Sequence, residues 1–313
     1  MTDKARRGAR GEAMADSARG GDMADGARGG DMAGGARGGE MADGARGGDW
    51  ASGARGGDWA SGARGGDMAS GARGDKMTLV EALGVLPGVT AVTGGGGKTS
   101  LLWLLGQSLS GAGKKVLLAT TTHIFPPACP VLISPNAREL AAAFAQRSLL
   151  AAGTAPRDGR LGALANLEEL AQCCDYVLVE ADGARRLPLK CPASHEPVVP
   201  ACARRAIVVA GMDGVGQRIE AVCHRPALYA QMCGKVETDV VTASDVARVL
   251  CAADGGRKGI ACEIEYLLNK ADSPERLRAA RAIARLLPHA VVGATQCNVG
   301  ERWRDGESVL LPA

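Results

Sequence analysis

The residues of this chain best suited to chemistry are four glycines followed by a lysine and two hydroxyl side chains. Residues 94–97 are glycines, and they stand between an apolar segment and a leucine-rich one. Glycines let successive backbone N–H groups turn toward one point, and a following helix N-terminus adds a positive dipole end. A lysine can then contact the outer phosphates of a nucleotide, and a threonine hydroxyl can bind its Mg²⁺. The pattern predicts an exposed phosphate-binding loop made of Gly94, Gly95, Gly96, Gly97, Lys98, Thr99 and Ser100.

The spacing of this loop differs from the common pattern G-x-x-x-x-G-K-[ST], because Val92 occupies the place of the first glycine. The loop is closer to x-G-G-x-G-K-T and resembles the SIMIBI class of P-loop nucleoside triphosphatases. Several members of that class have a lysine where this chain has Thr93. A glycine-rich turn that binds no ligand is the alternative interpretation.

Two carboxylates follow an apolar run further along the chain. Residues 176–179 predict a buried strand, and Glu180 and Asp182 come at its end. In an extended segment residues two apart lie on one face, so both carboxylates can reach the same ligand. An acid at a strand end is the Walker B arrangement, in which it holds the magnesium shell or orients water. We therefore expect Lys98, Glu180 and Asp182 to be catalytic, and Thr99, Glu180 and Asp182 to hold Mg²⁺.

A third motif stands at the end of a later predicted strand. Asn269, Lys270 and Asp272 form the pattern N-K-x-D, which reads guanine in GTPases. By itself the tetrapeptide is weak evidence for guanine binding, but here it follows a glycine loop and a Walker B strand. It favours GTP as the nucleotide and leaves ATP open.

Candidate substrate residues lie in two further places. Threonines and a histidine end the predicted strand 115–119, where ligands of doubly wound sheets gather. The prolines of the loop 187–197 interrupt both helices and β-ladders. This favours a rigid loop that contacts a substrate over a segment of the core. The alternatives are that the threonines only end a strand and that the loop only connects two elements. The candidates are Thr121, Thr122, His123, Arg185, Lys190, His195 and Glu196.

Strand-like and helix-like segments alternate from residue 89 to residue 294. This alternation predicts a doubly wound α/β fold with a mostly parallel sheet and helices on both faces. Capping residues place helix starts at Thr242 and Ser273. The segment from residue 147 to residue 160 is expected to be irregular, and the strand at 290–294 is expected to be the last.

Residues 1–76 differ from the rest of the chain. They repeat a nine-residue unit readable as G-G-D-M-A-D-G-A-R and contain almost no Leu, Ile or Val. Such a segment cannot bury a core, so we expect a disordered repeat region followed by one domain over residues 77–313. The unit lacks the large apolar residue of calcium-binding nonapeptides. Acids balance its arginines, which argues against an RNA-binding segment.

Composition excludes several classes of protein. The net charge of the whole chain is only +3, which argues against a nucleic-acid surface. No apolar run reaches the ~20 residues of a membrane span, and none follows the N-terminus as in a signal peptide, so we expect a cytoplasmic protein. The ten cysteines form no C-x-x-C pair, which argues against zinc and disulfides. Cys191 beside Lys190 is the candidate for a reactive thiol, because a cation lowers a thiol pKa.

Taken together, the motifs resemble the YqeC family over essentially all of residues 77–313. The residues that carry this resemblance are 93–99, 120–122, 180–183, 187–190, 195–197, 224–225 and 268–272. The resemblance implies an accessory role in selenium cofactor biosynthesis, or in maturation of a selenium-dependent molybdenum hydroxylase. The implied partner is that hydroxylase or its cofactor-inserting machinery, and a homodimer stays open.

The expected function is therefore Mg²⁺-dependent binding and hydrolysis of GTP or ATP in support of that maturation. One alternative is a small-molecule kinase, in which Asp182 or His195 would take a proton from the substrate. The other is a nucleotide-gated chaperone that turns over slowly.

Overall fold

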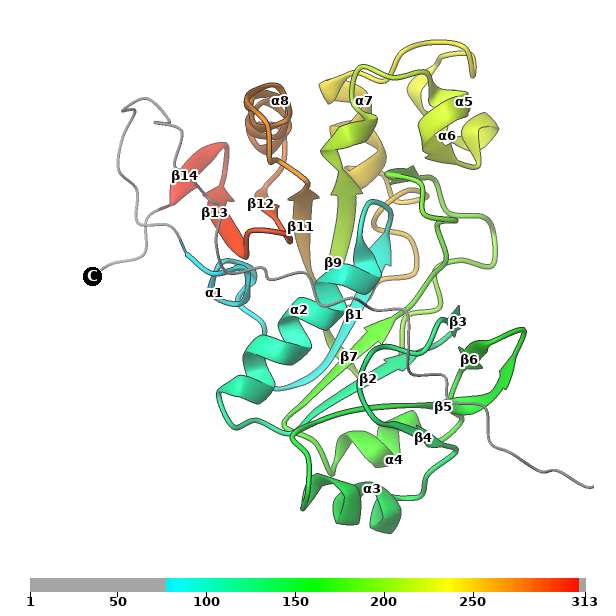
Figure 1. The fold of residues 1–313 in the computed structure, drawn as a ribbon. Helices are drawn as coiled ribbons and strands as arrows, with labels where there is room; N and C mark the ends of the chain where they lie inside the picture. The colour runs from blue at the N-terminus through cyan, green and yellow to red at the C-terminus, as the bar shows by residue number, and fades with distance from the viewer. Residues whose placement is uncertain (1–76, 310–313) are drawn as a thin grey trace, which may run out of the picture. The chain divides into compact units, whose positions relative to one another are not determined.

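The computed structural model describes residues 77–309, which belong to one compact unit built around a large sheet (Figure 1). The sheet has twelve strands in the order β14-β13-β12-β11-β9-β1-β7-β2-β5-β6-β3, and β4 pairs with β5. The predicted repeats and their disorder lie outside the described residues.

The strands of the sheet fall into a parallel centre and antiparallel margins. Their bounds are β1 Gly88–Gly94, β2 Val116–Thr120, β3 His123–Ile124, β4 Val131–Ile133, β5 Leu149–Arg157, β6 Arg160–Gly162, β7 Tyr176–Glu180, β9 Ala203–Gly211, β11 Glu263–Asn269, β12 His289–Ala294, β13 Val299–Arg304 and β14 Glu307–Val309. A separate two-stranded sheet pairs β8 (Leu189–Lys190) with β10 (Cys223–His224) in parallel.

The central seven strands, from β12 to β5, are all parallel. β1 lies in the middle of this group. The chain reaches β2, β5 and β7 on one side of it, and later reaches β9, β11 and β12 on the other. Such a reversal of strand order leaves a crevice at the carboxyl ends of the strands, where open α/β sheets bind ligands.

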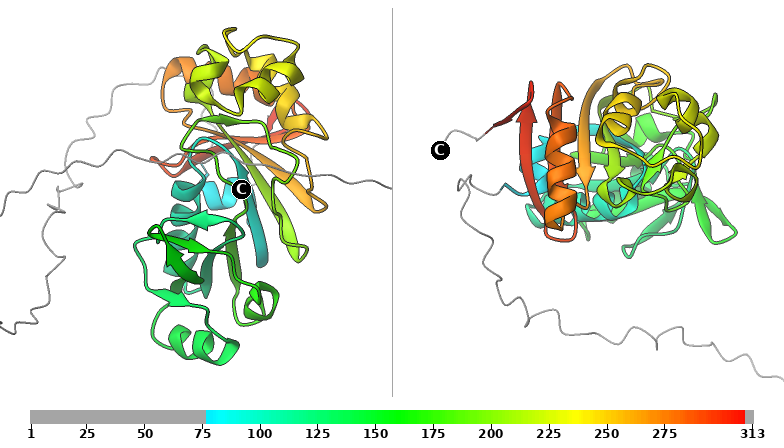
Figure 2. Two further views of the ribbon diagram at one scale, coloured as in Figure 1. Left: turned by 90° about the vertical axis from the view of Figure 1, so that its right-hand side faces the viewer. Right: turned by 90° about the horizontal axis from the view of Figure 1, so that it is seen from above.

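Helices cover both faces of the sheet, as the views of Figure 2 show. Their bounds are α1 Leu79–Leu83, α2 Lys98–Gly111, α3 Ala137–Phe144, α4 Leu167–Ala171, α5 Ile219–Val222, α6 Pro226–Cys233, α7 Ala243–Cys251 and α8 Pro274–Ala284, with a 3₁₀ turn at Met212–Gly214. Side chains alternate across each strand. On β9, Ile207 and Val209 pack with α1 and α2, whereas Val208 and Ala210 face the layer of α6, α7 and α8. The expected mixed α/β architecture, with a mostly parallel central sheet, is confirmed.

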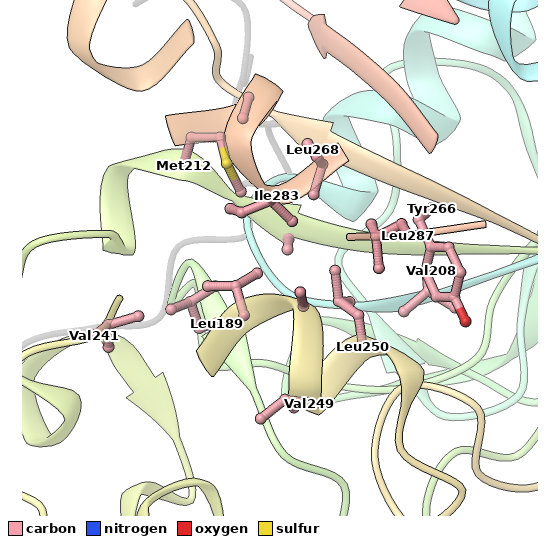
Figure 3. Close-up of a cluster of buried hydrophobic side chains, with 14 of the residues drawn as sticks. Leu189, Val208, Met212, Val241, Val249, Leu250, Tyr266, Leu268, Ile283 and Leu287 are labelled. Atoms are coloured by element: carbon pink, nitrogen blue, oxygen red, sulfur yellow. The ribbon is translucent and has the colours of Figure 1, made fainter. Parts of the chain in front are cut away.

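The largest cluster of apolar side chains lies between β9, β11, β12 and the helices α6 to α8 (Figure 3). Burying these side chains stabilises the fold through the hydrophobic effect, at about 25 cal/mol per Å² of apolar surface. The cluster includes Leu189 of β8, so it also fixes the segment between β7 and β9. Two further clusters pack α1 and α2 on one face, and α3 and α4 on the other.

Helix starts follow the capping residues. The Thr242 hydroxyl accepts from the Asp245 amide, and the Asp245 carboxylate accepts from the Thr242 amide, which makes a capping box at the start of α7. At the start of α8 the Ser273 hydroxyl accepts from the Arg276 amide, and Pro274 follows at the first helical position. Both predicted starts are confirmed.

Two expectations about strands are wrong. The segment expected to be irregular holds the nine-residue strand β5 and, after a tight turn, the antiparallel β6. β12 is not the last strand, because β13 follows antiparallel to β12 and β14 follows antiparallel to β13. Both segments mix apolar and charged residues, so their sequence pattern does not indicate a strand. They form strands because neighbouring strands provide hydrogen-bond partners.

No helix within residues 77–309 is long and apolar enough to cross a membrane.

Candidate functional site

The residues singled out in the sequence meet at the carboxyl ends of the central strands. The glycine loop follows β1, Glu180 ends β7 and Asn269 ends β11. β1 and β7 are neighbours, with Val92 of β1 opposite Glu180. β7 lies between β1 and β2, which brings the glycine loop and the Walker B-like strand side by side.

The first amides of the glycine loop already have acceptors within the protein. The Gly94 amide donates to Asp182 Oδ2 (3.0 Å), the Gly95 amide to Val209 O (2.9 Å) and the Gly96 amide to Leu187 O (3.0 Å). A phosphate would therefore meet the amides that follow, in the first turn of α2. These have no acceptor inside the helix, because the acceptor would lie before its start.

Close packing explains why the loop needs glycine. Gly96 has a φ of +79°, and a Cβ there would lie 2.3 Å from the amide nitrogen of Gly211. Gly97, which precedes the first residue of α2, has a φ of +116°. A side chain at either position would strain the backbone, and at Gly96 it would also collide with β9.

Lys98 is buried, contrary to the expectation of an exposed loop lysine. Its side chain is 5% exposed, and its Nζ lies 2.7 Å from Gly94 O and 3.2 Å from Asp182 Oδ1. Glu180 Oε1 lies 4.0 Å away. The ammonium group is thus held at the glycine loop by oxygens of β1 and of the segment after β7.

Thr99 and Glu180 are in direct contact. The Thr99 hydroxyl donates to Glu180 Oε2 at 2.8 Å. Burial raises the pKa of Glu180, whereas the Lys98 charge and the Thr99 hydrogen bond oppose that rise. A hydroxyl and a carboxylate at the start of a helix are oxygen ligands of the kind that Mg²⁺ prefers.

Within residues 77–309, no three His, Cys, Asp or Glu side chains cluster in a way that could hold a metal ion. This pair could still hold Mg²⁺ with the help of water and phosphate oxygens, since Mg²⁺ usually keeps several such ligands. Asp182 Oδ1 is also buried, and the Lys98 ammonium lies 3.2 Å from it.

A series of alternating charges, here called the charge chain, leads away from the glycine loop. It runs from Lys98 through Asp182, Lys190 and Glu196 to Arg225. Lys190 Nζ lies 2.9 Å from Asp182 Oδ2, 3.0 Å from Glu196 Oε2 and 2.6 Å from the carbonyl oxygen of Gly183. Glu196 also pairs with Arg225 at 2.7 Å. The Lys190 side chain is only 1% exposed, so its three donors serve the protein itself.

These charges shift the titration of their neighbours. Burial alone would raise the pKa of Glu196, but the hydrogen bond and charge of Lys190, together with Arg225, lower it overall. Burial and the positive charges of Arg225, Lys190 and Arg185 lower the pKa of His224, against the effect of Glu196.

The N-K-x-D residues divide into a buried and a more open part. Asn269 is fully buried, donates from Nδ2 to Gly96 O at 2.8 Å and accepts from the Thr295 amide at 3.1 Å. Lys270 pairs with Asp213 at 2.6 Å, and Asp272 pairs with Arg276 at 2.6 Å. Asn269 thus supports the glycine loop, while Lys270 and Asp272 point to partners outside it.

The strand-end hydroxyls face the protein in this structure. The Thr121 hydroxyl donates to Val198 O at 2.6 Å, and the Thr122 hydroxyl lies 3.3 Å from that of Thr120. His123 is exposed and begins β3. In the segment after β7, Arg185 and His195 are exposed as well.

Cys191 is not a reactive thiol of lowered pKa. Its side chain is buried, and burial raises its pKa although Lys258, Arg225 and Lys190 act in the opposite direction. The prediction from the neighbouring lysine alone is therefore wrong, because desolvation outweighs the cations.

Sequence reasoning about roles missed Arg225 and Asp213, which pair with Glu196 and Lys270. Both have a sequence signal: Arg225 stands next to His224 before a helix-opening proline, and Asp213 follows the predicted strand 206–210. A cavity of about 30 Å³ also lies near Thr93, Asp182, Lys190 and Tyr229. It could hold about two water molecules and is too small for a nucleotide.

The fold and the site define an α/β protein in which a glycine-rich loop, a buried lysine and a strand-end carboxylate meet where a mostly parallel sheet reverses its strand order. A family model described as "YqeC protein" matches residues 90–227. "Uncharacterized protein YqeC" from Escherichia coli (strain K12) is 31% identical over 209 residues, which cover 63% of this chain and 82% of that protein. The chain belongs to the YqeC family. The matched residues 90–227 include the glycine loop and the whole charge chain, but not Asn269, Lys270 and Asp272.

Proposed function

We propose that this protein binds a nucleoside triphosphate with Mg²⁺ at the glycine loop and hydrolyses or transfers its outer phosphate. The observation that carries this is the contact of the Thr99 hydroxyl with Glu180, with the Lys98 ammonium 4.0 Å from the same carboxylate. Hydroxyl, carboxylate and lysine are the groups by which P-loop proteins hold Mg²⁺ and the phosphates. The adjacency of β1 and β7 supports a nucleoside triphosphatase of the SIMIBI-like P-loop type.

The residues have distinct roles in this function. Lys98 would leave Asp182 to neutralise charge on the outer phosphates, and the free amides of the first turn of α2 would bind the same group. Thr99 and Glu180 would hold Mg²⁺, which supplies charge neutralisation when bound. Asp182 accepts from the Gly94 amide and from Lys190. It would therefore hold the glycine loop in place rather than act as a base.

GTP is the favoured nucleotide. Asn269 supports the glycine loop, and Asp272 lies just before the N-cap of α8, with Arg276 as its partner. To accept hydrogen bonds from guanine, Asp272 would exchange or share that partner. ATP is the alternative, because the Arg276 pair already accounts for the Asp272 carboxylate.

The biological role that we propose is support of selenium cofactor biosynthesis or of maturation of a selenium-dependent molybdenum hydroxylase. This role comes from the resemblance of the family motifs, and the partner would be the hydroxylase or its cofactor-inserting machinery.

A second candidate function is a nucleotide-gated chaperone with slow turnover. The specific support is the hydrogen bond from the Gly96 amide to Leu187 O, which ties the glycine loop to the segment that leads into β8. A nucleotide that disturbs this bond would move that segment, and a client could sense the change.

Titration of the full chain with GTP and ATP, with and without Mg²⁺, tests the nucleotide site. We expect Mg²⁺-dependent binding in the wild type and weaker binding in Lys98→Ala. Lys114→Ala is the matched control, because Lys114 is exposed beyond the far end of α2. Absence of binding in the wild type with both nucleotides would refute the nucleotide site. Phosphate release that rises only after the hydroxylase is added would favour the chaperone.

A further inference from the structure

Two adjacent arginines form an unusual turn beside the glycine loop. Arg185 and Arg186 have φ values of +49° and +64°. The Leu187 amide closes the turn by donating to Ala184 O at 2.9 Å. Positive φ at both central residues is the pattern of a type I′ turn, which favours Asn-Gly. Residues with a Cβ are unfavourable there, so local backbone preference does not explain the arginine pair.

The turn is fixed on the glycine loop by backbone contacts on its carboxyl side. Leu187 O accepts from the Gly96 amide (3.0 Å), and Pro188 O accepts from the Gly211 amide (2.9 Å). A Cβ on Gly95 would lie 2.8 Å from both of these carbonyl oxygens. On the amino side, Gly183 O accepts from the buried Lys190. The two arginines are thus within one or two residues of atoms that touch the glycine loop.

The charge of the arginine pair is not used inside the protein. Asp182 and Glu196 already pair with Lys98, Lys190 and Arg225. Arg185 and Arg186 are both exposed, and neither has an ion pair within residues 77–309. The site therefore has two positive charges beyond those that its own carboxylates neutralise.

We propose that Arg185 and Arg186 bind the outermost phosphate of the nucleotide, as a cation pair supplied by the protein itself. This inference rests on the proposed function, and it names the group that the turn recognises. Guanidinium groups match phosphate oxygens with paired hydrogen bonds. A triphosphate has this outer group and a diphosphate lacks it, so the pair discriminates between the two. Strained backbone at functional sites persists where the surroundings hold it, and the contacts of Leu187 and Pro188 hold this turn.

The test uses the full-length protein and the variants Arg185→Asn, Arg186→Asn and the double variant. Asparagine adopts positive φ more readily than arginine, so these variants keep the turn. We expect an unchanged or higher Tm together with a preference for triphosphate over diphosphate that falls about tenfold, as for a lost charged hydrogen bond. If the arginines had a merely structural role, the loss of selectivity would be accompanied by a lower Tm.

Ser134→Asn is the control for backbone strain, because Ser134 is exposed with a φ of +47° before α3, outside the glycine loop and the charge chain. It should leave the ratio of the two Kd values unchanged. Arg147→Asn removes an exposed positive charge that follows α3 and should also leave the ratio unchanged.

The readout is the Kd for the Mg²⁺ complexes of GTP and of GDP, and of ATP and ADP. If the wild type binds and the double variant keeps its triphosphate preference, the arginine inference is overturned and the proposed function stands. The same result is expected if the pair instead binds an anionic group of a second substrate. If the wild type binds none of the four nucleotides, the proposed function itself fails.

Discussion

Two strand ends of this protein carry nucleotide-type motifs, and they are built differently. At the end of β7, Glu180 and Asp182 are buried and contact Thr99 and Lys98 directly. At the end of β11, only Asn269 is buried, while Lys270 and Asp272 pair with half-exposed partners. Groups that act on phosphate need fixed positions, since misplacement weakens electrostatic stabilisation. Groups that read a base need to exchange partners when the ligand binds. We therefore propose that the β7 end supplies catalysis and the β11 end supplies selectivity.

The largest expected effect is on turnover at the β7 end. Glu180→Gln should lower Mg²⁺-dependent phosphate release by about 10²–10³-fold, as for the loss of one preorganised electrostatic group. Binding should change far less than turnover, because glutamine can still accept the Thr99 hydrogen bond. Steady-state phosphate release measures the effect, with the exposed Glu237→Gln as control. Wild-type turnover in Glu180→Gln would remove the catalytic role of this strand end.

Lys98→Ala should weaken nucleotide binding by about 1.5–3 kcal/mol, the value of a hydrogen bond to a charged group. Because Lys98 is buried beside Asp182, the variant should also lose some stability, although Lys190 still neutralises that carboxylate. Isothermal titration and thermal unfolding measure the two effects, with Lys114→Ala as control. If the affinity is unchanged, the glycine loop does not bind phosphate.

At the β11 end the expected change is one of selectivity rather than of rate. Wild type should prefer GTP over ATP by about 1–3 kcal/mol if the Asp272 carboxylate is the main discriminator. Asp272→Asn turns one acceptor into a donor, so the variant should lose GTP and gain XTP. Titration with ATP, GTP and XTP decides the matter. Equal weakening of all three would mean that Asp272 only supports α8, by pairing with Arg276 and the helix dipole.

The smallest effect concerns the acid stability of the charge chain that leads from the β7 end. The folded-state pKa of Glu196 is lowered, so its ionised form stabilises the fold at pH values above its unfolded pKa. That stability is lost as pH falls from about 4.5 through the lower folded value. Glu196→Gln should therefore be less stable than wild type at neutral pH, and the difference should shrink in acid. Urea unfolding at several pH values tests this, with Glu237→Gln as control. If the difference in the free energy of unfolding is the same at every pH, Lys190 and Arg225 do not lower the pKa of Glu196.

The sequence alone predicts helix starts and buried strands, because neighbouring residues determine them. Thr242 and Ser273 mark helix starts because a capping side chain bonds to an amide three residues away. The apolar run before Glu180 predicts the buried strand β7, since burial on both faces favours apolar residues at every position. The alternation of such runs with helices was enough to predict a mostly parallel sheet.

Tertiary structure decided the rest, because the causes lie far apart in the chain. Gly96 must be glycine on account of Gly211, more than a hundred residues later, and β5 is a strand because β2 pairs with it. Lys98 is buried because Asp182 reaches it from the segment after β7. Cys191 sits beside a lysine in sequence, yet desolvation by its surroundings raises its pKa. Spacing along a chain does not encode burial, distance between segments or local dielectric, and these set the charge and the partners of each candidate residue.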